Sequence, residues 1–452
     1  MEKNVHFVSL GCPKNLVDSQ VMLGLLKTDK YNVIDDPMSA NVIVVNTCSF
    51  IDSSKKESVD TILEMAEYKD KGKCETLVMA GCMAQRYKDQ LQLEMPEVDL
   101  FIGTGEYQRI AELVDWARKG ELPQRAYVHK PAFIHTEAHP RMQTGEFFSA
   151  YLKISEGCNR HCSFCIIPKL RGNTRSRTVD SLVEEAKILA SQGVKELNLI
   201  AQDLTEYGME FRYKQMTLEK LLPVLAAIEG IQWIRLFYAY PDQFSDELID
   251  IMANEPKVVK YLDMPIQHTS DRILKLMNRK FTRKEIFDFI GKLRAKMPNI
   301  YLRTSTIGGF PGETEEEFEA FLEDLKVLKF DHLGAFAYSK EEDTKAALLD
   351  GQLPMKTRIA RQRRIRKLHD EYSKVRNLMQ VGKEFDVLVE GVSEETELLL
   401  KGRHAGQAPE IDGQILINDG DAAPGDIVRV RITEALPLDL VGAIVGSPSL
   451  LH

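Results

Sequence analysis

Long hydrophobic runs are missing from this sequence, and none approaches the roughly 20 apolar residues that a membrane-spanning helix needs. The first residues, Met1-Glu-Lys-Asn-Val, also lack the basic and apolar segments of a secretory signal peptide. These two absences argue against an integral membrane protein and a secreted one. We therefore expect a cytoplasmic protein without a membrane partner.

Cysteine is scarce as well, with 7 residues in a chain of 452. An odd number at uneven spacing argues against a disulfide framework and favours metal or redox chemistry. Hydrophobic residues make up 44% of the chain, which is enough for real cores, and a chain of this length predicts about three domains.

Three of the cysteines lie in one short segment directly after the apolar run 151–154. The segment reads Gly157-Cys158-Asn159-Arg160-His161-Cys162-Ser163-Phe164-Cys165. Iron–sulfur clusters are normally held by four Cys thiolates, so a group of three leaves one iron open to an outside ligand. A loop at the carboxyl end of a strand would also place the cluster on the catalytic face of an α/β barrel.

Zinc is the alternative metal, because His161 or a later histidine would complete a tetrahedral site with three Cys ligands. The iron–sulfur interpretation is favoured for two reasons. Phe164 supplies an apolar cover, and no second CxxC or HxxxH pair follows at the spacing of a zinc finger. His161 is then expected at the surface or beside the ligands.

The CxxxCxxC spacing with an aromatic residue before the third Cys resembles the radical S-adenosylmethionine superfamily. This resemblance implies that Cys158, Cys162 and Cys165 hold a 4Fe-4S cluster whose open iron binds S-adenosylmethionine, with Phe164 among the cofactor-binding residues. One electron from an external donor would cleave the cofactor to a 5′-deoxyadenosyl radical, which abstracts hydrogen from an unactivated carbon. The protein would supply positioning and a dry site.

A second set of three cysteines follows apolar strands in the first 110 residues. Cys12, Cys48 and Cys82 each come one to three residues after such a strand. Because helical stretches separate the strands, a parallel sheet is predicted, and its carboxyl edge would gather all three thiols at the place where open α/β sheets bind ligands. The alternative is that each thiol is a small buried apolar side chain. Cys74 lies in a charged loop and is left out of the set.

The central part predicts six strands separated by helices, and so an open, six-stranded (β/α) partial barrel. The predicted strands are 151–155, 196–201, 233–239, 261–265, 301–307 and 332–338. A helix at 314–329 should begin at Thr314, which precedes three acidic residues.

Two loops of this barrel carry further candidates for cofactor binding. Gly308 and Gly309 follow the fifth strand and would let backbone approach the adenosyl group, although a tight turn explains them equally. Gln202 and Asp203 follow the second strand and would bind the amino acid end or the ribose of the cofactor, unless they simply cap a helix.

Two basic segments have alternative interpretations. The loop 171–177 meets carboxylates of substrate or cofactor, or it is solvated. The stretch 356–367 resembles a nucleic-acid patch, but Ile359, Ile365 and Leu368 recur at helical spacing. A connecting helix docked through one apolar face is therefore favoured.

After Val381 the chain changes to five short predicted strands, which suggest a small antiparallel β-barrel. Residues 381–452 contain 13 acidic and 5 basic residues, a net charge of −8 in a chain whose total is −9. RNA binding requires Lys and Arg to neutralise phosphates, so this barrel is better suited to a basic protein.

The two cysteine sets and the terminal barrel together resemble the methylthiotransferase family, whose C-terminal domain is called TRAM. The segment Gly11-Cys-Pro-Lys-Asn15 is similar to the RimO-type branch, whereas the MiaB-like tRNA branch typically has Gly-Cys-Gln-Met-Asn. The resemblance implies a second 4Fe-4S cluster on Cys12, Cys48 and Cys82 and two uses of S-adenosylmethionine. The implied reaction is methylthiolation of the β-carbon of an aspartate in the basic ribosomal protein twelve of the small subunit. Modification of isopentenyl-adenosine in tRNA is the alternative, and a zinc-stabilised binding module is a more distant one.

The chain is thus expected to be a multidomain α/β protein. The predicted divisions are a parallel α/β domain with the auxiliary cluster at 1–125, the partial barrel at 140–375, and the substrate-binding TRAM barrel at 378–447.

Overall fold

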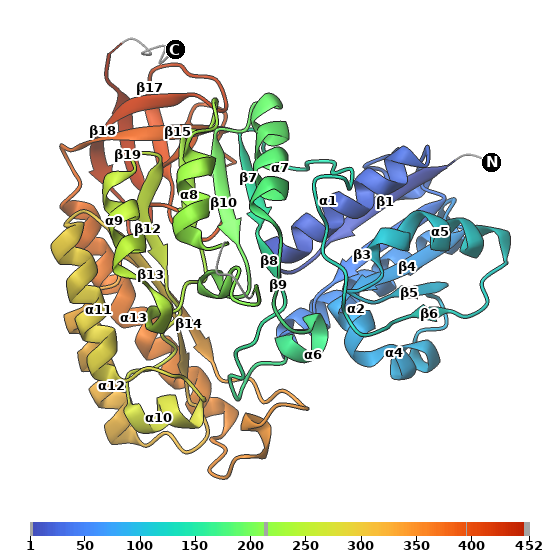
Figure 1. The fold of residues 1–452 in the computed structure, drawn as a ribbon, viewed down its shortest axis with the longest axis horizontal. Coiled ribbons are helices and arrows are strands. Elements are labelled where there is room, and N and C mark those ends of the chain that lie inside the picture. Colours follow the sequence, from blue (N-terminus) through green and yellow to red (C-terminus); the bar gives the residue numbers. More distant parts are fainter. Residues whose placement is uncertain (1–2, 212–215, 395, 447–452) are drawn as a thin grey trace.

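The computed structural model describes residues 3–211, 216–394 and 396–446, in which three parts follow one another along the chain (Figure 1). The N-terminal part is a parallel sheet covered by helices on both faces. A larger open sheet with its own helices follows, and a small barrel at the C-terminal end packs beside that open sheet. The predicted α/β multidomain fold is confirmed.

The N-terminal sheet has six strands, all parallel, in the order β2-β1-β3-β4-β5-β6. Its central strands β3 and β4 are buried along their whole length, as expected for apolar strands covered on both faces. Helices α1 and α5 pack on one face, and α2 and α4 on the other. The elements are β1 (Asn4–Ser9), α1 (Pro13–Thr28), β2 (Asn32–Val33), β3 (Val42–Thr47), α2 (Asp52–Ala66), α3 (Tyr68–Lys71), β4 (Thr76–Gly81), α4 (Cys82–Glu94), β5 (Leu100–Ile102), α5 (Ile110–Lys119) and β6 (Ala126–Tyr127).

The central sheet has six parallel strands in the order β14-β13-β12-β11-β10-β7, and its two edge strands do not pair with each other. The predicted open six-stranded partial barrel is therefore confirmed. The strands are β7 (Ser149–Lys153), β10 (Glu196–Ile200), β11 (Trp233–Leu236), β12 (Val258–Asp263), β13 (Tyr301–Gly308) and β14 (His332–Ala337). The helices are α6 (Ile167–Arg171), α7 (Val179–Ser191), α8 (Leu218–Ala226), α9 (Asp246–Asn254), α10 (Asp271–Leu276), α11 (Arg283–Lys296) and α12 (Glu315–Leu328). Helix α12 begins as predicted, with Thr314 and Glu317 forming a capping box.

The basic stretch forms α13 (Met355–Leu378), a helix docked along β14 and α12. Ile365 is fully buried in the core of the partial barrel, and Leu368 packs against the same core. Arg361 and Arg364 both pair with Glu315 at 2.8 and 3.0 Å. This arrangement matches the favoured prediction of a docked connecting helix.

The C-terminal barrel is closed by five strands in the order β15-β16-β17-β19-β18. Its strands are β15 (Glu384–Val392), β16 (Leu400–His404), β17 (Ile415–Asp419), β18 (Ile427–Ala435) and β19 (Leu440–Ile444). The predicted small β-barrel is confirmed and four of its strand pairs are antiparallel, but β17 and β19 pair in parallel. Leu388 and Ala408 of this barrel pack with Tyr151, Phe237 and Tyr261 of the central sheet.

None of the helices in the described part of the chain has both the length and the apolar character required to span a membrane.

Candidate active site at the junction of the first two domains

The N-terminal cysteine set, Cys12, Cys48 and Cys82, gathers at the carboxyl edge of the N-terminal sheet. Strands β1, β3 and β4 are neighbours in that sheet, and Cys12, Cys48 and Cys82 follow their carboxyl ends. Gly11 shows how closely two of these loops approach, since a Cβ added there would lie 2.8 Å from the Cβ of Cys48. The structure thus brings the three predicted thiols to one edge of the sheet.

Glycines with positive φ angles directly precede three of the six cysteines. Gly11, Gly81 and Gly157 directly precede Cys12, Cys82 and Cys158, and all three have φ between 84° and 99°. Such positive angles are disfavoured for residues with a side chain. At Gly157 a Cβ would also lie 2.2 Å from the carbonyl oxygen of Asn173.

Burial affects two of the three thiols of the N-terminal cysteine set. Cys48 and Cys82 are buried, and burial raises the pKa of Cys48 and raises that of Cys82 to about 12. Cys12 is exposed. Cys74 lies apart in the apolar core with Ile43 and Leu77, where burial raises its pKa to about 11, in keeping with its exclusion from the set.

The cysteine loop 157–165 follows the short strand β8 (Ser155–Glu156) and is held by acidic side chains of the barrel loops. Arg160 donates to Asp203 at 2.9 Å and to Asp242 at 2.7 Å. The backbone N–H of Asn159 donates to Glu206 at 2.9 Å. These contacts fix the loop at the carboxyl ends of the barrel strands, as predicted. His161 is exposed, also as expected.

Cys162 is the best connected sulfur of this loop. Its Sγ lies 3.5 Å from the Tyr240 hydroxyl and accepts a hydrogen bond from Arg279 Nη1 at 3.4 Å. The guanidinium groups of Arg160 and Arg279 both lie over the Tyr240 ring, at 4.6 and 4.2 Å from its centroid. Burial raises the pKa of the Cys158 thiol and raises that of Cys165 to about 12.

Helix α6 connects the two cysteine sets. It begins two residues after Cys165, and its residue Leu170 forms a buried cluster with Ile166 and Cys82. The two sets therefore lie on either side of one short helix, at the junction between the N-terminal sheet and the partial barrel.

Arg171, at the end of α6, occupies the centre of this junction. It is 2% exposed and pairs with Asp18 of α1 at 2.8 Å and with Glu156 at 3.0 Å. Its Nη2 also donates to Asn15 Oδ1 at 2.5 Å and lies 3.7 Å from the Sγ of Cys82.

The other arginines of the basic loop 171–177 also have partners within the protein. Arg177 pairs with the buried Glu185. Arg175 donates to the backbone carbonyls of Arg171 and Asn173. The solvated interpretation of this loop is wrong for Arg171 and Arg177, which are buried, and a contact with carboxylates of substrate or cofactor stays a prediction.

The predicted cofactor residues Gln202 and Asp203 lie beside the cysteine loop 157–165. Asp203 accepts from Arg160 and from the backbone N–H of Thr205, and burial raises its pKa to about 6. Gln202 donates to Glu156 at 2.7 Å, while its Oε1 is buried without a hydrogen-bond partner. Asp203 thus positions the loop and caps a turn, and the unpaired amide oxygen of Gln202 is free to accept from a ligand.

Phe164, Gly308 and Gly309 pack with the protein itself. Phe164 is partly buried against an apolar cluster that includes Phe310 and Tyr338. Gly309 has φ +79°, and an added Cβ would lie 2.8 Å from the Cα of Arg358 in α13. A close helix contact is therefore a sufficient reason for this glycine, and its part in cofactor binding stays a prediction.

Sequence reasoning missed several residues of the site. Asn15 anchors two cysteine loops, because its Nδ2 donates to the carbonyls of Leu10 and Thr47 at 2.9 Å. Lys14, 8% exposed, lies with its Nζ 3.1 Å from the centroid of the Tyr238 ring at the end of β11. Lys14 and Asn15 could have been predicted only because they lie close to Cys12 in the chain. Arg279 could not have been predicted, because no residue near it in the sequence indicates a contact with Cys162.

An acidic cleft of about 570 Å³ opens between α1, β7 and the C-terminal barrel. Its lining includes six carboxylates and two basic side chains, both already paired, Arg403 with Glu196 and Glu390 and Lys401 with Glu394. The acidic side chains are Glu146, Glu390, Glu394, Glu410, Asp412 and Asp439. This cleft would attract a basic partner.

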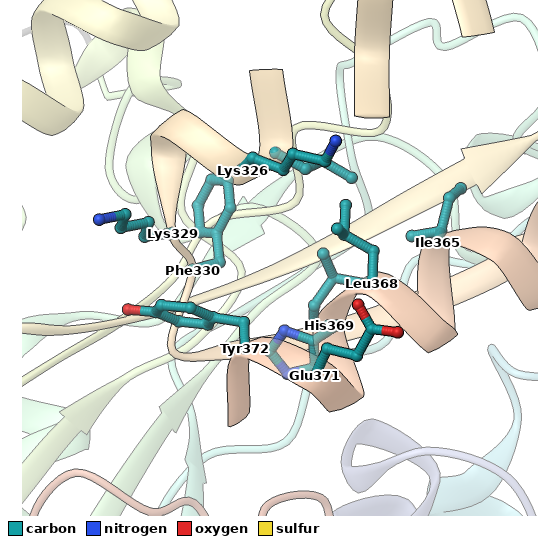
Figure 2. Close-up of a pocket in the computed structure, with 10 residues that line it drawn as sticks. Lys326, Lys329, Phe330, Ile365, Leu368, His369, Glu371 and Tyr372 are labelled. Atoms are coloured by element: carbon teal, nitrogen blue, oxygen red, sulfur yellow. The ribbon is translucent and has the colours of Figure 1, made fainter. Parts of the chain in front are cut away.

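A smaller cavity of about 270 Å³ lies between α12 and α13 (Figure 2). Phe330, Leu368 and Tyr372 contribute to its lining, as does His369, whose pKa burial lowers to about 3. It shares no residue with either cysteine set, so we do not place the site there.

The donor chemistry at the junction fits iron–sulfur clusters. Each set offers three sulfur donors from backbone-constrained loops, and each has one buried arginine against a sulfur, Arg171 at Cys82 and Arg279 at Cys162. Such charges and hydrogen bonds stabilise thiolate-ligated clusters. Within residues 3–211, 216–394 and 396–446, no group of three or more His, Cys, Asp or Glu side chains is close enough to hold a single metal ion.

Family comparisons divide the chain into the same three parts. Residues 4–103 match the uncharacterized protein family UPF0004, residues 152–325 the radical SAM superfamily, and residues 381–445 the TRAM domain.

Curated relatives match over nearly the whole chain. The ribosomal protein uS12 methylthiotransferase RimO of Pelobacter propionicus is 50% identical over 443 residues, covering 98% of both chains. The proteins of the same name from Geobacter sulfurreducens and Bdellovibrio bacteriovorus are 49% and 47% identical, covering 98% of this chain and 99% and 98% of their own.

Solved structures show the fold at lower similarity. The radical S-adenosylmethionine methyltransferase TsrM from Kitasatospora setae superposes with a TM-score of 0.54 at 15% identity, over 75% of this chain and 74% of its own. The cobalamin-dependent S-adenosylmethionine radical enzyme OxsB gives 0.51 at 14% identity, over 81% of this chain and 56% of its own.

Proposed function

Because the chain belongs to the RimO family of ribosomal protein uS12 methylthiotransferases, we propose that it adds a methylthio group to the β-carbon of an aspartate in uS12. The observation that carries this proposal is the presence of one cysteine set just before α6 and of Cys82 of the other set against that helix, in a chain that matches those relatives over 98% of its length. A ribosomal protein substrate implies that the enzyme acts in the cytoplasm.

Cys158, Cys162 and Cys165 would hold the 4Fe-4S cluster that binds S-adenosylmethionine, and Cys12, Cys48 and Cys82 would hold the auxiliary one. When bound, these groups and an external electron donor supply the one-electron chemistry that replaces hydrogen on an unactivated carbon by sulfur. The protein contributes the scaffold: Arg160 fixes one loop to Asp203 and Asp242, and Asn15 and Arg171 fix the other. Gln202, Asp203, Phe164, Gly308 and Gly309 remain the proposed cofactor contacts.

Charge supports a basic protein as the acceptor. The cleft between α1, β7 and the C-terminal barrel is lined by six acidic side chains against two basic ones, and the segment from residue 381 onward carries −8. Phosphate-rich tRNA would be repelled by such a surface. The C-terminal barrel is therefore proposed as the part that binds uS12.

The test is anaerobic incubation of the reconstituted enzyme with S-adenosylmethionine, a reductant, and either uS12 or tRNA, followed by mass spectrometry of each. We expect a methylthio group on one aspartate of uS12 and none on tRNA. The reverse pattern would refute the acceptor assignment. Iron and acid-labile sulfide of about eight each per chain are expected for two 4Fe-4S clusters.

Two cysteine variants separate the roles of the clusters in the same assay. Cys162→Ala should abolish both cofactor cleavage and product, whereas Cys48→Ala should leave cofactor cleavage and block sulfur insertion. Full methylthiolation by the Cys48 variant would refute the two-cluster scheme. Cys74→Ala, which removes a thiol of the apolar core, is the matched control and should keep both cofactor cleavage and product.

A further inference from the structure

Lys14 is a buried cation without a hydrogen bond or ion pair in the described part of the chain, and the nearest negative charges that act on it are those of Cys12, Asp263 and Glu156. Its side chain is 8% exposed. Its contact is with the ring of Tyr238, 3.1 Å from the centroid. Burying an ammonium group is costly unless an anion or several acceptors compensate it, and a cation–π contact compensates only in part.

The backbone of the partner residue is strained. Tyr238 has φ +58°, a left-handed conformation that is rare for a residue with a bulky side chain. Strain of this kind persists where surrounding structure enforces it, commonly at functional sites. Here it places the ring of Tyr238 directly beneath the Lys14 ammonium.

The nearby acids lie outside ion-pair distance of Lys14, although the charges of Asp263 and Glu156 act on it and Asp263 Oδ1 has no hydrogen-bond partner among the described residues. Asp263, which ends β12, receives the backbone N–H of Tyr238 at 3.4 Å and has Arg303 at 4.0 Å from its Oδ1. Asp18 and Glu156 pair with Lys153 and Arg171. The charge of Lys14 therefore has no dedicated carboxylate among the described residues.

The location of Lys14 suggests what would pair with it. It lies two residues after Cys12 in the first turn of α1, and it contacts Tyr238 just past the carboxyl end of β11. An acceptor carbon must lie between the N-terminal cysteine set and the catalytic edge of the partial barrel to be reached from both. In aspartate the β-carbon bears the carboxylate, so the residue that holds this carboxylate also positions the reacting carbon.

We propose that Lys14 binds the carboxylate of the acceptor aspartate and so selects aspartate as the residue to be modified. This inference rests on the proposed function and adds the specificity-determining residue. Compensation of auxiliary-cluster charge is the competing role. The geometry favours the substrate, because Arg171 already approaches Cys82, whereas Lys14 is directed at Tyr238 and makes no hydrogen bond to a cysteine sulfur.

The experiment measures binding to the cluster-loaded full-length enzyme in the presence of S-adenosylmethionine. The ligands are uS12 and uS12 with its acceptor aspartate replaced by asparagine, which keeps the shape and removes the charge. We expect the unmodified enzyme to bind the aspartate form at least about tenfold more tightly, as for a desolvated charge pair. Lys14→Met should remove this preference by weakening only the aspartate form, and Lys14→Arg should retain most of it.

Lys27→Met is the matched control, because Lys27 is an exposed residue in the last turn of the same helix. It should keep the full preference. Iron content and far-UV circular dichroism show whether each variant is folded and loaded.

Several outcomes would overturn the inference. An unchanged preference in Lys14→Met would do so, and if iron were also lost, Lys14 would be assigned to the auxiliary cluster. Equal binding of both uS12 forms by an unmodified enzyme that methylthiolates uS12 would refute the role of Lys14 and leave the proposed function intact. If the unmodified enzyme acts on tRNA and not on uS12, the proposed function fails and this inference fails with it.

Discussion

Each cysteine set has one buried arginine against one of its sulfurs, although the two arginines come from distant parts of the chain. Arg171 lies 3.7 Å from Cys82, and Arg279 donates to Cys162 at 3.4 Å. A positive charge and a donated hydrogen bond both stabilise the reduced, more negative form of a cluster. The two arginines are therefore expected to raise the potentials of the proposed clusters.

Arg279→Gln should lower the midpoint potential of the radical cluster by roughly tens of millivolts, because it removes the charge beside Cys162. The measurement is a redox titration followed by electron paramagnetic resonance, in a background in which Cys12, Cys48 and Cys82 are alanine. Arg283→Gln is the control, since Arg283 pairs with Asp324 at the surface. An unchanged potential in Arg279→Gln would show that the hydrogen bond does not influence the cluster.

Individual residues of the site were predictable only where a reactive side chain also follows a recognisable strand in the sequence. The six cysteines could be selected because a thiol after an apolar strand is conspicuous, and the structure brings three of them to the predicted sheet edge. Arg279 and Tyr240 could not, because they reach Cys162 from loops 117 and 78 residues away. The burial of Arg171 and Arg177 in the basic loop could not be predicted, because their acidic partners Asp18 and Glu185 lie on other elements.

Among the elements, α13 depends on a close approach to the end of β13. Gly309 follows that strand with φ +79°, and the Cα of Arg358 in α13 lies where its Cβ would be. The N–H of Gly309 also donates to Glu313, which is paired with Arg361 at 2.8 Å. Helix, turn and strand thus form one buried unit.

Gly309→Ala should lower the free energy of unfolding by about 1–3 kcal/mol, because the side chain enforces both strain and a clash. Gly291→Ala provides a control of opposite sign. Gly291 lies in α11 with no atom within 4 Å of an added Cβ, so alanine should stabilise the helix by up to about 1 kcal/mol. Urea denaturation measures both variants, and equal effects would contradict the proposed packing role.

Long elements were predictable and very short ones were not. Each of the six barrel strands was predicted from an apolar run between helical stretches. The two-residue strands β2, β6, β8 and β9 (Arg175–Ser176) carry no such signal, because two residues cannot show a periodicity. The parallel pairing of β17 with β19 depends on barrel closure, which local sequence does not encode.

At the scale of the whole molecule, a buried carboxylate ties the C-terminal barrel to the partial barrel. Glu196 of β10 is fully buried and pairs with Arg235 of β11 at 2.9 Å and with Arg403 of β16 at 2.7 Å. These two arginines lower the pKa of Glu196 to about 2, against the opposing effect of burial. The charged form of Glu196 is therefore favoured in the folded protein.

Glu196→Gln should destabilise the attachment of the C-terminal barrel by about 3–5 kcal/mol at neutral pH, since it leaves two buried arginines undercompensated. Because the pKa of Glu196 is lower in the folded protein, its ionisation stabilises the folded state at pH values above the ordinary pKa of 4.5. This stabilisation is lost as the pH falls towards 2. The advantage of the unmodified protein over the variant should therefore shrink below about pH 4.5. Hydrogen exchange of β16 across this range measures it.

Glu434→Gln is the control for this experiment, because Glu434 is exposed on β18. It should match the unmodified protein at every pH. A constant difference between the unmodified protein and Glu196→Gln across the same pH range would mean that Glu196 does not act through its charge.

The buried ion pairs around Arg171 also limit how such a protein can be recombined. Asp18 of the N-terminal part lies between Lys153 and Arg171 of the central part, all three almost without exposure. An N-terminal domain exchanged for one without this aspartate would leave two cations opposed by Glu156 alone, at a cost of several kcal/mol. The N-terminal and central parts therefore cannot be exchanged independently of each other. A functional chimaera must keep Asp18 of α1 together with Lys153 and Arg171.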